Sequence, residues 1–209
     1  MNFLFSLSIN KYYVLMIFWN IFLAVIPCAV AYYAYISVKK KTWADLKTSE
    51  KISAALIFLF WLFMFPNTAY LFSIPRHIVD YCPAYNKYEV CLDNGRTWMV
   101  FFFFFYALLG VPTFYYALKK MSLTFRSLFN RTASVLLPAV IIPVTSIGVM
   151  FGLIERYNSW DVIFNPASLI NTFIGYFMSA DLFFTFLFFT LMLYMVYYGL
   201  DVFIKKNSR

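Results

Sequence analysis

Charged residues are scarce in this chain of 209 residues. Asp, Glu, Lys and Arg make up 12% of it, whereas a soluble domain averages about a quarter. Apolar and aromatic residues make up 63%, and the mean hydropathy is +0.74. This composition would expose too much apolar surface to water but suits a lipid bilayer. It excludes a soluble globular protein, and the length predicts a single integral membrane domain over residues 1–209.

The residue types that carry most enzyme chemistry are also few. The chain has one histidine, His77, and three cysteines. Together with Cys82 and Cys91 the histidine offers three ligands without the usual spacing of a zinc site, so we expect no metal and no cofactor. There is no nucleophile elbow, zinc-protease motif, Gly-rich phosphate loop or pair of intramembrane aspartates. These absences leave an enzymatic role open but give it little support.

Acidic residues are outnumbered by basic ones, nine against 17, which gives a formal net charge of +8. In a soluble protein this excess would suggest nucleic-acid binding. No arginine-rich helix or interleaved aromatic pattern accompanies it here, so we expect no nucleic-acid partner. In membrane proteins, Lys and Arg concentrate in cytoplasmic loops.

The distribution of these bases predicts an orientation. Twelve of the 17 lie on one side of the apolar runs and five on the other, which predicts a multi-pass protein with its N-terminus outside and its C-terminus in the cytoplasm. The first residues carry neither a basic region nor a small-residue cleavage pattern, so we expect no removable signal peptide.

Five apolar runs are long enough for helices that cross a bilayer, which takes about 20 residues each. They cover residues 12–38, 52–73, 97–118, 132–154 and 181–204. In a further segment, about 163–178, apolar residues recur at helical spacing with polar residues between them, as is typical of a helix in the membrane interface. We therefore predict an all-α polytopic transmembrane helical bundle, with about five spans plus one interfacial or re-entrant helix.

Two cysteines lie in one polar loop that the charge distribution places outside, where disulfides persist. A bridge between Cys82 and Cys91 would close a short loop and add roughly 2–3 kcal/mol of stability. The alternative is two free thiols near the membrane surface. Cys28, within the first span, is expected to be a small core hydrophobe.

The other polar residues gather near the predicted outer boundary of the membrane, which leaves basic loops and little else on the cytoplasmic side. Asn67 follows Pro66 near the far end of the second span, roughly 22 Å from its cytoplasmic edge at 1.5 Å per residue. His77 lies just beyond that span, and residues 156–161 follow the fourth span on the same side. Ionisable groups at membrane depth are costly and tend to mark sites. We therefore expect one polar pocket at the outer leaflet.

The chemistry of these residues suits a binding site. Arg156 could hold a phosphate or carboxylate through two parallel hydrogen bonds, His77 could exchange a proton near neutral pH, and Asp161 could orient either. Structural roles are also compatible with the same residues. Asn67 would then belong to a helix break, and Ser159 or Asp161 would be the N-cap of the next helix. Trp160 would be an anchor in the membrane interface.

Two stretches resemble one protein family. Residues 60–71 read F-W-L-F-M-F-P-N-T-A-Y-L and, with His77, are similar to its motif W-L-x-F-x-P-N-x-x-Y-L…H. Residues 152–161 read G-L-I-E-R-Y-N-S-W-D and are similar to its motif G-R-F-x-R-x-N-S-W-D. The family is DUF1361, bacterial membrane proteins of uncharacterised function, and the resemblance covers residues 19–204. It implies a bacterial cytoplasmic membrane and these candidate positions: Trp61, Pro66, Asn67, Tyr70, His77, Arg156, Asn158, Ser159, Trp160 and Asp161.

The chain departs from the family pattern at two places. Ser73 and Ile74 stand where the family usually has Thr-Asp, and Leu153 stands where the second motif has its first Arg. A mechanism that needs an Asp–Arg couple at those positions is not supported by this chain.

Three functions are compatible with these observations. The first is binding or transport of a small anionic or lipid-headgroup ligand in the outer pocket, with ligand contacts from Asn67, Tyr70, His77, Arg156, Asn158, Ser159, Trp160 and Asp161. The second is an accessory subunit, either in a larger membrane complex or as a homo-oligomer. The third is an enzyme on a lipid-linked substrate, with His77 as general base. Because the second to fourth spans carry no charge, an ion-driven carrier is disfavoured.

Overall fold

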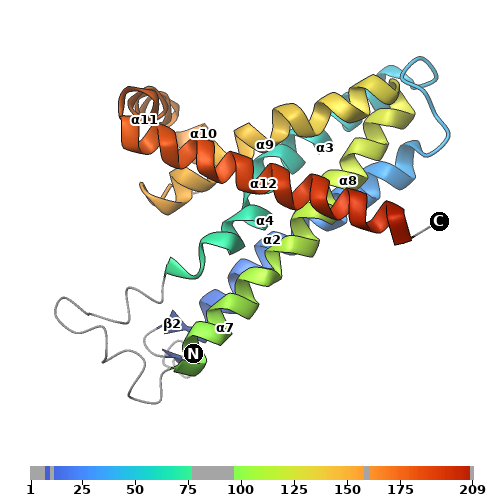
Figure 1. Ribbon diagram of the computed structural model, residues 1–209. Coiled ribbons are helices and arrows are strands. Elements are labelled where there is room, and N and C mark those ends of the chain that lie inside the picture. Colours follow the sequence, from blue (N-terminus) through green and yellow to red (C-terminus); the bar gives the residue numbers. More distant parts are fainter. Residues whose placement is uncertain (1–7, 10–11, 77–96, 158–160, 208–209) are drawn as a thin grey trace.

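The computed structural model describes residues 8–9, 12–76, 97–157 and 161–207 (Figure 1). Within these residues, five helices are long and apolar enough to cross a membrane. A sixth and shorter helix, α11 (Pro166–Met178), precedes the last of them. The predicted all-α, multi-span architecture is therefore confirmed.

The elements follow one another in two halves. The first half contains β1 (Ser8–Ile9), β2 (Tyr12–Tyr13), α2 (Val14–Val38), α3 (Thr48–Met64), α4 (Pro66–Tyr70) and the 3-10 helix η1 (Leu71–Ser73). The second half contains α7 (Thr97–Leu108), α8 (Gly110–Leu128), α9 (Arg131–Leu153), α10 (Asp161–Phe164), α11 and α12 (Ala180–Asn207). The two short strands pair with each other and lead into α2. The predicted bridge between Cys82 and Cys91 lies outside the described residues.

Local chemistry explains where several helices begin and break. The Glu50 carboxylate accepts a hydrogen bond from the backbone N–H of Lys47 at 2.9 Å and so satisfies a donor that the first turn of α3 leaves unpaired. Asn130 does the same for α9, since its side-chain oxygen accepts from the N–H of Ala133 at 2.8 Å. Pro66 has no N–H to donate, and α3 gives way to α4 there.

The third long helix runs further than the sequence predicts. The segment 97–118 was expected to end at Lys119 and Lys120, but α8 continues through both residues to Leu128. The Lys119 ammonium pairs with the Asp201 carboxylate, and the Lys120 ammonium lies 4.8 Å from the centre of the Tyr35 ring. A lysine with such a partner inside the bundle does not have to end a span.

Stacked aromatic rings form the centre of the bundle. The ring of Phe65 lies 4.5 Å from that of Trp61 and 5.4 Å from that of Phe114, and all three side chains are fully buried. By contrast, Phe188 and Met195 on α12 are 74% and 72% exposed. Large apolar side chains that point outward are expected on helices surrounded by lipid.

The helix ends form two groups. At one end the loop after α2 contacts the end of α8: the N–H of Trp43 donates to the carbonyl of Leu128 at 2.8 Å, and the Ser127 hydroxyl donates to the carbonyl of Val38 at 3.0 Å. We name this the lysine end, after the bases of residues 39–51 (Figure 1, upper right). The motif end is formed by residues 66–76 and 148–157, at the opposite ends of the second and fourth long helices.

A charged cluster lies inside the bundle near the lysine end. Asp201 is only 9% exposed, and its carboxylate pairs with Lys119 of α8 and, at 2.5 Å, with Lys205 of its own helix. The Tyr115 hydroxyl donates to the same carboxylate at 3.1 Å. The sequence predicts basic loops and little else in this region, and that prediction is wrong. The cluster holds α12 against α8.

Replacing Asp201 with Asn should destabilise the protein, because it leaves the Lys119 ammonium without its counter-charge. We expect a loss of about 2 kcal/mol, which is less than the roughly 3–5 kcal/mol of a fully buried pair, since Lys119 keeps 30% of its side chain exposed. Thermal unfolding in lipid nanodiscs would measure it. Asp181→Asn, at the exposed start of the same helix, should change little. Equal melting temperatures for the two variants would contradict the role given to Asp201.

Candidate functional site

The first motif is fixed to the fourth long helix by a very close contact. A Cβ atom added to Gly148 of α9 would lie 2.8 Å from Cγ of Pro66, which is closer than real Cβ contacts. Only glycine therefore lets α4 approach α9 to this distance. The proline that breaks the second span is also the residue that places α4 on α9.

Asn67 serves the helix break. Its side-chain amide donates a hydrogen bond to the carbonyl of Met64 at 2.9 Å, and the hydroxyl of Thr68 donates to the carbonyl of Phe65 at 2.8 Å. Near a proline, the regular backbone donors of a helix are missing, and side chains can replace them. These bonds agree with the structural interpretation of Asn67 as part of a helix break.

Two further contacts continue in the same direction along α9. The Tyr70 ring lies against Gly152, where an added Cβ would meet Cε2 of that ring at 3.5 Å. At the next residue of α9, Nη1 of Arg76 donates to the carbonyl of Leu153 at 2.5 Å. This carbonyl is one of those that a helix leaves unpaired at its C-terminus. The two motif segments are far apart in the sequence, but these contacts show that residues 66–76 lie along the end of α9.

Arg76 was not singled out in the sequence, where it appeared as one base of a polar loop. No pattern there reveals that its partner is a backbone carbonyl in another helix. In the structure it closes the end of α9. A cationic side chain is also favourable at this position, because the C-terminus of a helix carries partial negative charge.

Arg156 follows the end of α9 in an unusual backbone conformation. Its φ angle is +63°, in the left-handed region that costs a non-glycine residue roughly 1–2 kcal/mol. The next residue, Tyr157, closes the turn through a hydrogen bond from its N–H to the carbonyl of Phe151 at 3.1 Å. The Arg156 side chain is exposed, and no side chain in the described part of the chain pairs with it. The chain thus holds a strained turn that presents a guanidinium.

A row of hydroxyl groups on α11 faces the same turn. Ser168, Thr172 and Tyr176 recur every fourth residue, so they share one face of the helix. The Tyr157 hydroxyl lies 2.5 Å from that of Ser168 and 3.4 Å from that of Thr172. In the sequence, the polar residues of this helix indicate only an interfacial position. Their spacing was visible in the sequence, but their partner Tyr157 was not.

Tyr176 ends this row in an apolar environment. Its side chain is only 3% exposed and its ring lies 5.5 Å from that of Phe151, yet its hydroxyl has no hydrogen-bond partner in the described residues. Burial, together with the nearby Glu155 and Tyr157, raises the pKa of Tyr176 to about 12. The hydroxyl is therefore neutral at physiological pH and can donate or accept a hydrogen bond. An unpartnered buried hydroxyl is costly and needs an explanation.

The structure places four of the eight residues predicted to contact a ligand. Asn67 supports the helix break, Tyr70 packs on Gly152, Arg156 is exposed in its turn and Asp161 begins α10. The others lie outside the described residues, namely His77, Asn158, Ser159 and Trp160. In the described residues, the turn after α9 presents the exposed Arg156 side chain, and the Tyr157 hydroxyl of the same turn contacts hydroxyl groups of α11.

Comparison with known proteins agrees with the motifs at this site. The family described as protein of unknown function (DUF1361) matches residues 19–196, a range that contains both motif segments and all of the long helices except the start of α2 and the end of α12. No curated protein and no solved structure matches the chain. With most of its length matched, the chain belongs to the DUF1361 family.

Proposed function

We propose that the motif end binds a phosphate-bearing lipid headgroup at the outer leaflet of the membrane. The observation that carries this proposal is the set of three contacts between the motif segments, Pro66 on Gly148, Tyr70 on Gly152 and Arg76 on Leu153. These contacts hold two packed helices together, and the turn that contains Arg156 follows the end of one of them. A site held by rigid elements loses less entropy when a ligand binds.

The Arg156 guanidinium is the proposed phosphate contact. Arg76 is already committed to the end of α9, whereas Arg156 has no side-chain partner in the described residues. A guanidinium can hold two oxygens of one phosphate through parallel hydrogen bonds. The left-handed backbone at this residue also agrees with a site, because strain of this kind concentrates where a side chain is held for function.

The charges nearby favour a headgroup over a free anion. Glu155 precedes Arg156 and lies close enough to Tyr176 to raise the pKa of that hydroxyl. A simple anion at Arg156 would be repelled by this carboxylate. A headgroup that joins a phosphate to an ammonium, or to hydroxyl groups, would satisfy Arg156 and Glu155 together.

The hydroxyl row supplies the neutral contacts. The Tyr157 hydroxyl already contacts those of Ser168 and Thr172, and the Tyr176 hydroxyl is buried without a partner among the described residues. A ligand or water that reached this hydroxyl would remove an unsatisfied polar group. The outer-leaflet position rests on the positive-inside rule, which assigns the lysine end to the cytoplasm.

Substituting Arg156 with Lys should weaken binding of glycerophosphoethanolamine, a soluble headgroup, by about tenfold, because a lysine cannot form the two parallel hydrogen bonds. Isothermal titration calorimetry in detergent would measure the dissociation constant. The control is Arg126→Lys at the lysine end, where no loss is expected. Unchanged affinity in the Arg156 variant would remove this residue from the site. Tighter binding of inorganic phosphate than of the headgroup would assign the site to free anions.

Replacing Gly148 with Ala should separate α4 from α9, because the new methyl group would overlap the Pro66 ring. We expect a loss of stability of about 1–3 kcal/mol together with weaker headgroup binding. Thermal unfolding and the same calorimetric titration measure the two effects. Gly199→Ala provides a matched control, since a Cβ there meets nothing within 4 Å. If both alanine variants behave alike, the close helix contact does not support the site.

Tyr176→Phe should weaken headgroup binding without lowering the stability of the protein. Without ligand, removal of a buried and unpartnered hydroxyl should leave the stability unchanged or raise it by about 1 kcal/mol. If a ligand uses that hydroxyl, headgroup affinity should fall. Tyr157→Phe is the comparison, because it breaks existing contacts with Ser168 and Thr172 and should lower the stability. Equal affinity of the Tyr176 variant and the unaltered protein would show that this hydroxyl is not part of the site.

A further inference from the structure

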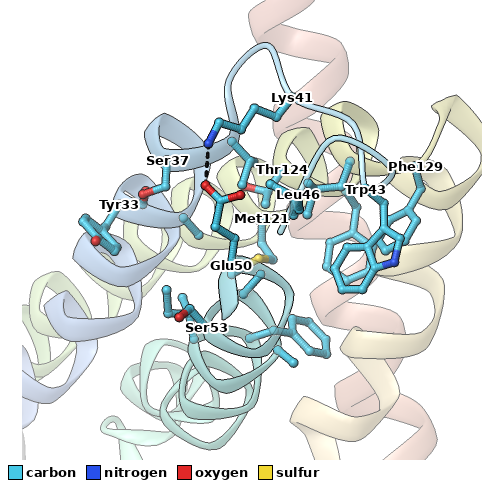
Figure 2. A pocket seen from close by; sticks show the side chains of 18 of the residues that line it. Tyr33, Ser37, Lys41, Trp43, Leu46, Glu50, Ser53, Met121, Thr124 and Phe129 are labelled. Carbon is cyan, nitrogen blue, oxygen red and sulfur yellow. Dashed lines mark hydrogen bonds and ion pairs between the residues drawn. The ribbon is translucent and has the colours of Figure 1, made fainter. Parts of the chain in front are cut away.

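The described residues enclose a cavity of about 380 Å³ at the lysine end, which the motif end does not explain. It lies between the end of α2, the start of α3 and the end of α8, and the loop after α2 covers one side of it (Figure 2). Its volume is within the range of about 300–1,000 Å³ that is typical of small-molecule sites. It is separate from the motif end, since none of its lining residues belongs to residues 66–76 or 148–157.

Small side chains keep the cavity open. Ala34 and Ser37 of α2 and Ser53 and Ala54 of α3 all line it, and side chains this short leave the space between the two helices unfilled. Its inner wall is apolar and includes Phe58, Met121 and Phe125. An apolar cavity holds water poorly, and the cost of leaving one empty grows with its volume. The cavity therefore favours an apolar occupant.

The cavity also reaches the outer surface of the bundle. Two of its lining residues, Tyr33 of α2 and Ser53 of α3, are exposed, and the neighbouring Ile52 and Leu56 are 56% and 61% exposed. In a membrane-spanning bundle these apolar outward surfaces contact lipid. A hydrocarbon chain could therefore enter sideways from the bilayer, between α2 and α3.

Charged groups stand at the polar side of the cavity. The Lys41 ammonium pairs with the Glu50 carboxylate at 2.7 Å, and both side chains remain partly exposed, 46% and 38%. Figure 2 shows Glu50 reaching toward Lys41 above the apolar wall. The acids here are occupied, since Glu50 also accepts from the backbone of Lys47, and Asp45 accepts from Thr42. Five lysines lie in residues 39–51 against these two acids, so the surroundings carry excess positive charge.

We infer that this cavity binds one anionic phospholipid of the bilayer, with an acyl chain between α2 and α3 and its phosphate at Lys41. The apolar wall matches the chain, and the excess of lysine matches the negative headgroup. The Lys41 ammonium has three donors, so it can hold a phosphate oxygen while it remains paired with Glu50. Serine hydroxyls on both helices lie between the two parts. This inference does not depend on the function proposed for the motif end.

The test is lipid retention in vesicles made of phosphatidylcholine and phosphatidylglycerol. Protein purified from them is washed with detergent, and the bound phospholipid is identified by native mass spectrometry. The unaltered protein should retain phosphatidylglycerol in preference to phosphatidylcholine. Ala54→Leu fills the cavity and should lower retention about tenfold. Ala29→Leu adds the same bulk to the exposed face of α2, away from the cavity, and should have no effect.

Two substitutions at the charged side test the headgroup contact. Lys41→Gln should abolish the preference for phosphatidylglycerol and leave retention of the chain. Glu50→Gln removes the competing carboxylate and should increase that preference, whereas a purely structural ion pair would give no increase. Equal retention by the two leucine variants would overturn the inference, as would retention of phosphatidylcholine without preference. A change of oligomeric state in Ala54→Leu instead of lipid loss would assign the cavity to contacts between copies of the chain.

Discussion

The contact of Pro66 with Gly148 is the constraint on which the motif end depends. A proline inside a membrane-spanning helix leaves backbone groups without their regular partners, so it is tolerated only where other groups replace them. Here Asn67 and Thr68 supply donors from within the break, and the glycine lets the broken segment lie directly on α9. The direction of the chain after the break brings Tyr70 onto Gly152 and Arg76 onto the end of α9. Pro66 and Asn67 therefore serve helix packing, and the proposed ligand contacts depend on the position that this packing gives to the motif end.

The charged side chains described inside the bundle are stabilised by partners on neighbouring residues. Asp201 is shared by Lys119 and Lys205 and receives the Tyr115 hydroxyl, while Lys120 lies over tyrosine rings. An isolated charge in a bilayer is costly, and pairing or a contact with the interface reduces that cost. Arg156 differs, since it is exposed at the motif end with no side-chain partner in the described residues. The contrast separates residues whose charge holds helices together from the residue that we propose as the phosphate contact.

The sequence predicts the long helices well because the thickness of a bilayer fixes their length and apolar runs are visible without any tertiary information. It fails where a partner is distant along the chain. The sequence predicts that a helix ends at Lys119, because nothing near it along the chain neutralises its charge. Its partner is Asp201, which lies in another helix. The family motifs indicated that two segments belong together, but not that Arg76 closes α9. The spacing of Ser168, Thr172 and Tyr176 was present in the sequence, yet it became informative only when the structure placed Tyr157 against it.

The filled centre of the bundle bears on the choice between binding and transport. The stacked rings of Trp61, Phe65 and Phe114 are fully buried and lie between the two ends of the bundle. Interiors of this kind are packed as closely as organic crystals, so a solute could pass from one end to the other only if several large aromatic side chains moved together. In this conformation the lysine-end cavity opens sideways toward lipid, and the motif end lies beyond the rings. The two proposed lipid sites at opposite ends of the bundle fit this arrangement better than one path through its centre, which favours the proposed binding role over a channel.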